Sequence, residues 1–178
     1  MKRYIDYIIR SEEHRVDEML FLQIKDESDL CYGMMRGDVV EAKPTIYMMA
    51  TALALYFNNK SRYYKSEALM DALHLAIDGA ARVQRSNGYI DYPCCNFFSA
   101  PDTSFCFKRL NYGYRLLDKY GDSPKEELLK EKYYAIMRKA AEAIRDGGFH
   151  TPNHRWAICA ALTQAAMLFS DDAEFQKV

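Results

Sequence analysis

The chain has 178 residues, 49% of them hydrophobic and 28% charged, a composition typical of one globular domain with a substantial core. Its formal net charge of −1 and its pI of about 6.4 argue against a nucleic-acid-binding protein. We find neither a secretory signal nor a stretch of about 18 apolar residues, and we expect no membrane partner. Five cysteines, an odd number without regular spacing, favour reduced thiols and therefore a cytoplasmic location.

Apolar residues recur with a helical period along almost the whole chain, which predicts an all-α fold. The expected helices cover residues 2–25, 44–58, 66–86, 102–119, 124–145 and 152–169, and a further helix begins at residue 171. The segment 44–58 is almost wholly apolar and should be buried, whereas 66–86 is amphipathic and should face water on one side. Ser66 is a suitable N-terminal cap for that outer helix, and Ser123 with Pro124 opens another.

Three of the helices begin after a proline in similar wording: AKPTIYMMATALAL, SAPDTSFCFKRLNY and HTPNHRWAICAALT. Pro44, Pro101 and Pro152 are about 50 residues apart, and each of these helices is followed by a more polar one. The repeat predicts a helical-hairpin array with apolar helices inside and polar helices outside. We expect one domain, with an N-terminal helix and loop over residues 1–43 and about three hairpins over 44–178.

The amino-terminal ends of the three inner helices should point to the same end of the array. Such ends carry unpaired N–H groups and a partial positive charge, which suit anions and sugar hydroxyls. The candidate side chains there are Asp102, Asn153, His154, Arg155 and Trp156 on the first turns and Tyr89, Tyr92 and His150 in the loops. Two of them have a structural alternative, because Asp102 is also a good helix cap and Trp156 also fits a core position.

The hairpin repeat, together with SAPDTSF and GGFHTPNHRW, resembles the catalytic domain of the heparinase II/III-like and alginate-lyase-like polysaccharide lyases. The resemblance covers roughly residues 40–170. It implies an (α/α) toroid, usually followed by a β-sandwich, and a uronate-containing polysaccharide or oligosaccharide as the substrate. We expect neither a cofactor nor a metal, because Cys94 and Cys95 with His150 or His154 match no standard zinc spacing.

In these lyases an Asn commonly neutralises the uronate carboxylate, a His or Tyr removes the C5 proton, and a Tyr or His protonates the leaving oxygen. The resemblance implies that Asn153 meets the carboxylate, that His154 is the base or a charge stabiliser, and that Tyr92 is the acid. This chemistry is coherent, because the developing negative charge must be stabilised and a neutral imidazole can accept the proton. We assign substrate binding to Asp102, Arg155, Trp156, His150 and Tyr89.

The chain departs from the family in containing only three inner helices, about half of the ring, and no strand-rich second half. We therefore expect an exposed apolar edge through which copies associate into a homo-oligomer. Two alternatives to a lyase stay open. A glycoside hydrolase on the same helical ring needs two carboxylates, for which Asp102 and Asp91 are candidates. A non-catalytic helical module that binds sugar or protein needs no catalytic groups.

Overall fold

The computed structural model describes residues 2–149 and 151–175, and this part of the chain contains six helices and no β-strand. The helices are α1 (Lys2–Leu22), α2 (Lys43–Tyr56), α3 (Glu67–Val83), α4 (Ala100–Tyr120), α5 (Pro124–Arg145) and α6 (Pro152–Leu168). The all-α prediction is therefore confirmed. The helix expected from residue 171 is not formed over residues 171–175, which follow α6 as turns. Among the described residues, no helix combines the length and the apolar character that crossing a bilayer requires.

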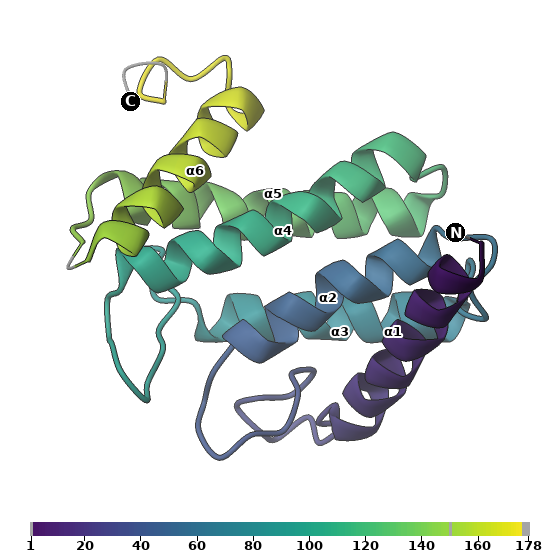
Figure 1. The fold of residues 1–178 in the computed structure, drawn as a ribbon. Coiled ribbons are helices and arrows are strands. Elements are labelled where there is room, and N and C mark those ends of the chain that lie inside the picture. Colours follow the sequence, from purple (N-terminus) through teal and green to yellow (C-terminus); the bar gives the residue numbers. More distant parts are fainter. Residues whose placement is uncertain (1, 150, 176–178) are drawn as a thin grey trace.

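The helices form two layers (Figure 1). In the front layer lie α2, α4 and α6, with α6 tilted away from the other two; α3 and α5 lie behind, and α1 packs against α2. The main contacts of each helix reach only helices one or two places away along the chain. As the repeat predicted, α2, α4 and α6 begin at the same end of the array. Closure of such an array into a toroid remains a prediction.

Serines cap three of the helices, and one cap differs from the expectation. Ser66 and Ser123 cap α3 and α5 as predicted, and Ser123 takes part in a capping box. α4 begins two residues earlier than expected because Ser99, rather than Asp102, is its N-cap; the Ser99 hydroxyl accepts a hydrogen bond from the Asp102 N–H at 3.2 Å. Thr151 precedes α6 but makes no side-chain cap, since its hydroxyl is hydrogen-bonded to Asn153 instead.

The first helix ends at Leu22, earlier than the predicted residue 25, because the next residues pair with the following loop. The Ile24 N–H donates to the Met34 carbonyl, and the Gly33 N–H donates to the Ile24 carbonyl, both at 2.9 Å. The buried Gln23 amide also donates to the carbonyls of Gly33 and Ala72, each at 2.8 Å. These bonds stabilise an extended exit from α1 and tie it to α3.

A stripe of alanines joins α6 to the rest of the molecule. Ala157, Ala161 and Ala165 are buried as predicted, and small side chains at this spacing allow helices to approach closely. Ala160 and Leu168 are only partly buried. The expected partners were helices 44–58 and 102–119, but α6 packs mainly on α4 and α5. The expectation is wrong for α2, because α4 lies between α2 and α6.

One carboxylate, that of Glu126, lies in the interior with a full set of partners. Its side chain is 1% exposed and accepts hydrogen bonds from Tyr56 Oη and Lys65 Nζ, each at 2.8 Å. The backbone N–H groups of Asp122 and Ser123 also donate to it, at 2.7 and 2.9 Å. Burial alone would raise the pKa of Glu126, but the bonds from Lys65, Asp122 and Tyr56 outweigh it and lower that pKa to about 2.

Large apolar side chains are exposed at both ends of the array. They include Tyr4, Ile5, Tyr7, Ile8 and Phe21 on α1 and Trp156 and Met167 on α6. Contiguous exposed apolar side chains often mark a surface that contacts another molecule. The expected homo-oligomer formed through an apolar edge therefore stays a prediction, with these side chains as its candidates.

Candidate functional site

A lysine at the start of α2 brings two of the candidate residues together. Lys43 Nζ lies 2.8 Å from Asp102 Oδ1 and 4.0 Å from the ring centroid of Tyr92. Burial alone would lower the pKa of Lys43, but the hydrogen bond and the charge of Asp102 outweigh it and raise that pKa. Asp102 therefore has a tertiary role in addition to its place in the first turn of α4. Sequence reasoning missed Lys43, although a lysine at a helix N-terminus is unfavourable and so signals a nearby carboxylate.

Two further titratable groups border this ion pair. Glu41 is partly buried beside it, and burial raises the pKa of the Glu41 carboxyl. Cys106 is fully buried one turn along α4, and burial strongly raises the pKa of its thiol. A thiol with a raised pKa is a poor nucleophile, so Cys106 serves as a small core residue here.

The loop before α4 places Tyr89 away from this cluster. The ring of Tyr89 meets that of Phe98 edge-on, with centroids 6.1 Å apart. Gly147 lies so close that an added Cβ would be 3.1 Å from Tyr89 Oη and 2.3 Å from Ala100 Cβ. Tyr89 thus packs in the seam between the loop and the end of α5, which supports a structural role.

The candidates at the start of α6 do not join the Lys43 cluster. Among the described residues, no hydrogen bond or ion pair links Asn153 or His154 to Asp102 or Tyr92. Asn153 is exposed and bonded to the neighbouring Thr151 hydroxyl. His154 is partly buried, and its Nδ1 is enclosed without a hydrogen-bond partner. The sequence-predicted constellation is therefore divided between two places at the same end of the array.

Arg155 and Trp156 both face solvent. The guanidinium of Arg155 lies 4.5 Å from the ring centroid of Phe149. Trp156 is 76% exposed, which excludes the core position that its apolar helix allowed and leaves a flat apolar platform at the surface. His150, the remaining candidate, lies outside the described residues.

A row of cations follows the open side of α4. This helix is covered by α5 behind and by α2 and α6 on its flanks, so one side remains open to solvent. On that side, Lys108, Arg115 and Lys119 recur at helical spacing, and none of them forms an ion pair with a described carboxylate. The two acidic residues of α4, Asp102 and Asp118, are paired with lysines of other elements.

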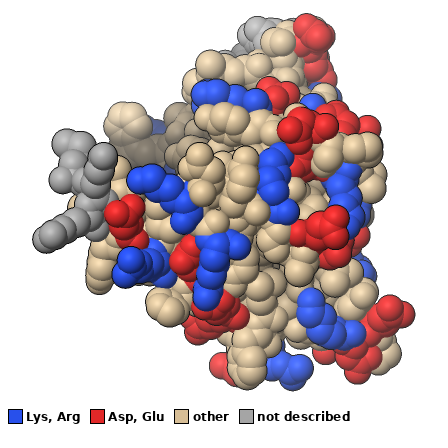
Figure 2. All heavy atoms as spheres, turned by 90° about the vertical axis from the view of Figure 1, so that its right-hand side faces the viewer, with Lys and Arg blue, Asp and Glu red and all other residues tan. Residues whose placement is uncertain are grey.

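The excess of basic over acidic side chains extends to the other helices of the front layer, α2 and α6. α2 and α6 contain no Asp or Glu, and α6 adds Arg155 near its start. Met167 lies opposite Arg115 in a shallow hollow between α4 and α6, and Trp156 lies three turns before Met167 on the same helix. We call Lys108, Arg115 and Lys119 of α4, together with the exposed Trp156 of the neighbouring α6, the basic face. By contrast, Figure 2 shows acidic and basic side chains intermixed over the side of the molecule that lies at the right in Figure 1.

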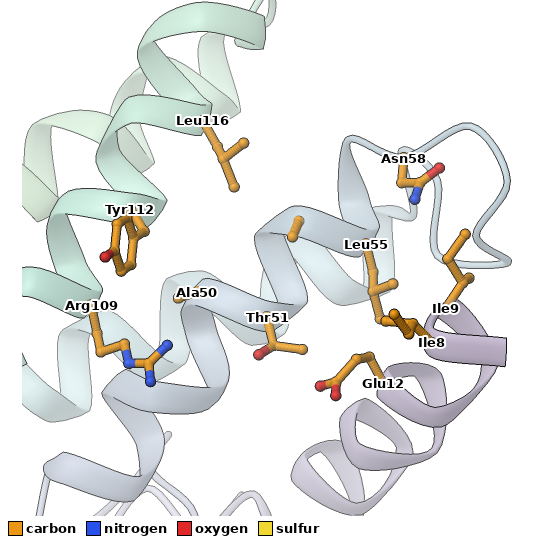
Figure 3. A pocket seen from close by; sticks show the side chains of 11 residues that line it. Ile8, Ile9, Glu12, Ala50, Thr51, Leu55, Asn58, Arg109, Tyr112 and Leu116 are labelled. Atoms are coloured by element: carbon orange, nitrogen blue, oxygen red, sulfur yellow. The ribbon is translucent and has the colours of Figure 1, made fainter. Parts of the chain in front are cut away.

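A groove opens on the other flank of α4. It has a volume of about 360 Å³ and lies between α1, α2 and α4 (Figure 3). Arg109 and Tyr112 of α4 form one wall, and the remaining lining residues are Ile8, Ile9, Glu12, Ala50, Thr51, Ala54, Leu55, Asn58 and Leu116. The guanidinium of Arg109 lies 4.8 Å from the ring centroid of Tyr47. Sequence reasoning did not find this groove, because it depends on how three helices cross.

No protein-family model, curated protein or solved structure matches the chain. What it binds must therefore follow from its own side chains. Among the described residues, no group of His, Cys, Asp and Glu could hold a metal ion. The basic face, set in a chain whose formal net charge is −1, is the feature that most clearly selects a class of ligand.

Proposed function

We propose that the basic face binds an anionic polysaccharide of the uronate type. The observation that carries the proposal is the row of Lys108, Arg115 and Lys119 on the open side of α4, which no described carboxylate neutralises. From the first to the last of these residues the helix rises by about 16 Å, so an extended chain of acidic sugars can contact all three. Because each exposed contact contributes only about 0.2–1 kcal/mol, binding should require several of them and weaken with salt.

The exposed Trp156 favours a sugar chain over other polyanions. A large aromatic ring offers a flat apolar surface to the C–H face of a sugar, and Trp156 is 76% exposed on the same layer as the cations. The basic face does not continue onto the side of the molecule at the right in Figure 1, where acidic and basic side chains are intermixed (Figure 2). A single extended chain fits a row of cations along one helix better than a nucleic-acid duplex.

A polyuronate lyase is the catalytic form of this proposal, and His154 favours it. Nδ1 of His154 is enclosed without a hydrogen-bond partner among the described residues, so Nε2 is the ring nitrogen that would accept the C5 proton. In β-elimination the C5 proton would pass to this imidazole, the C4–O bond would break, and the leaving oxygen would take a proton from water; Tyr92 would supply it only to a substrate that spans both groups of candidate residues. Asn153 would donate to the uronate carboxylate.

The glycoside-hydrolase alternative has less support. It requires one carboxylic acid that carries a proton and a second carboxylate across the bond. Both candidates are engaged in ion pairs, Asp91 with Arg85 at 2.6 Å and Asp102 with Lys43 at 2.8 Å. Each carboxylate is thus already held by a cation within the protein, which leaves no free pair of candidate carboxyl groups to flank a glycosidic bond.

Polyuronate binding is tested by calorimetric titration of alginate at low and at physiological salt. The Lys108→Ala/Arg115→Ala variant should bind about tenfold more weakly, because two contacts of roughly 0.7 kcal/mol are lost. A charge-matched control, Lys132→Ala/Lys139→Ala on α5, should bind as the unaltered protein does. The proposal fails if alginate does not bind at low salt, if the control pair weakens binding equally, or if single-stranded DNA binds as tightly as alginate.

Lyase activity is tested separately by the appearance of the unsaturated, ultraviolet-absorbing product. His154→Ala should abolish that product and leave alginate binding intact. Asn153→Ala should lower turnover more than binding, if its amide acts mainly on the enolate-like transition state. Full activity in both variants would remove the catalytic form of the proposal and leave the binding module.

A further inference from the structure

The groove between α1, α2 and α4 has the properties of a small-molecule site. Its volume of about 360 Å³ lies within the range of ligand pockets. It is hollow because Ala50 and Ala54, two small residues one turn apart, face it from α2. At roughly 30 Å³ for each non-hydrogen atom, taken from the volume of liquid water, it accommodates about a dozen such atoms.

Most of the lining is apolar. Ile8 and Ile9 of α1, Leu55 of α2 and Leu116 of α4 all line it. A sugar carries hydroxyl groups around its ring, and such a wall would leave several of them without partners. The body of the ligand should therefore be an alkyl chain or an aromatic ring.

One end of the groove carries an uncompensated positive charge. Figure 3 shows Arg109 on α4 reaching toward α2, with Thr51 between Arg109 and Glu12. Among the described residues, Arg109 has no carboxylate partner; its guanidinium contacts the ring and the hydroxyl of Tyr47. The only acidic lining residue, Glu12, is already paired with Arg15 at 2.9 Å. The groove as a whole therefore favours an anion.

We propose that this groove binds a small amphiphilic carboxylate, with its apolar body against Ile8, Leu55 and Leu116 and its carboxylate on Arg109. A planar guanidinium matches a carboxylate through two parallel hydrogen bonds, and the Thr51 hydroxyl can add a third. The inference goes beyond the proposed polysaccharide site, because neither Lys108 nor Arg115 lines this groove and Arg115 lines the hollow between α4 and α6 instead.

Octanoate is the probe, because its ten non-hydrogen atoms fit the groove. Calorimetric titration should give saturable binding with a dissociation constant on the order of 1 mM, in line with ligand efficiencies of about 0.3–0.5 kcal/mol per atom. Octanol, which lacks the charge, and acetate, which lacks the chain, should each bind at least about tenfold more weakly.

Two variants locate the site. Arg109→Gln should weaken octanoate binding about tenfold, whereas Arg36→Gln, which removes an equally exposed cation outside the groove, should not. Ala54→Leu fills the groove from an exposed position, so it should abolish binding without unfolding the protein, as circular dichroism checks.

The outcomes separate this inference from the proposed function. Arg109→Gln should keep its alginate binding, and Lys108→Ala/Arg115→Ala should keep its octanoate binding. The inference is overturned if octanoate shows no saturable binding, if Ala54→Leu still binds it, or if octanol binds as tightly as octanoate.

Discussion

Replacement of the buried Glu126 by glutamine should destabilise the protein by an amount that depends on pH. The pKa of Glu126 falls from an ordinary value of 4.5 to about 2 in the folded protein. A difference of this size corresponds to about 3 kcal/mol of folding free energy, at 1.36 kcal/mol for each pH unit. Because the folded pKa lies below the unfolded one, this contribution is present above about pH 4.5 and is lost as the pH falls toward 2.

Glutamine keeps the shape of the side chain but cannot serve the same donors. Its NH₂ group would face Lys65, Tyr56 or a backbone N–H, all of which donate to the carboxylate. Removal of the charge also leaves the partly exposed Lys65 with Asp122 as its remaining ion-pair partner, at 3.0 Å. At neutral pH we therefore expect Glu126→Gln to lower the free energy of unfolding by about 3 kcal/mol.

Urea denaturation followed by circular dichroism at several pH values measures this difference. The gap between the two proteins should be full at pH 7 and should narrow steadily below about pH 4.5, as the native carboxylate becomes protonated. Glu127→Gln is the matched control. Glu127 is the next residue along α5, its side chain is 59% exposed, and among the described residues it forms an ion pair only with Lys130. The reasoning is refuted if the gap at pH 7 is under about 1 kcal/mol, or if it is unchanged at pH 3.

Two further predictions concern packing and association. Ala161→Leu should lower the free energy of unfolding by about 1–3 kcal/mol, because Ala161 is fully buried where α6 meets α4 and α5. The control Ala160→Leu, at a partly exposed position, should lower it by less. Equal melting temperatures for the two variants would contradict this prediction. The protein should self-associate at high concentration through its exposed apolar side chains, and Tyr4→Lys/Tyr7→Lys should reduce that association; light scattering that finds only monomer before any substitution would overturn the expectation.

The helices were predictable because their signals are local. Each of the three prolines chosen as a helix start lies in the first turn of its helix, and the Ser123 capping box opens α5 at the expected residue. The helix ends were harder, since α1 stops where Gln23 finds carbonyl partners in the loop and in α3. Those bonds join residues 10 and 49 positions apart, and no local pattern records them.

The candidate site was predictable only in part, for the same reason. Asp102 and Tyr92 both contact Lys43, which lies 59 residues before Asp102 in the chain. This contact depends on how α2 packs against α4, and a single sequence does not reveal that packing. The cations of α4 were overlooked because they are separated along the chain and share a face only once the helix forms. For Trp156 the sequence allowed both a substrate-binding position and a core position, and its 76% exposure excludes the core position.

The short reach of the helix–helix contacts has a consequence for how the molecule opens. Since each helix relies mainly on partners one or two places away, stability is distributed along the array rather than held in one shared centre. α4 has neighbours on three sides, whereas α1 packs chiefly on α2 alone. Amide hydrogens should therefore exchange slowest in α4 and fastest in α1, with an intermediate rate in α6, so the array frays from its ends while its middle stays folded.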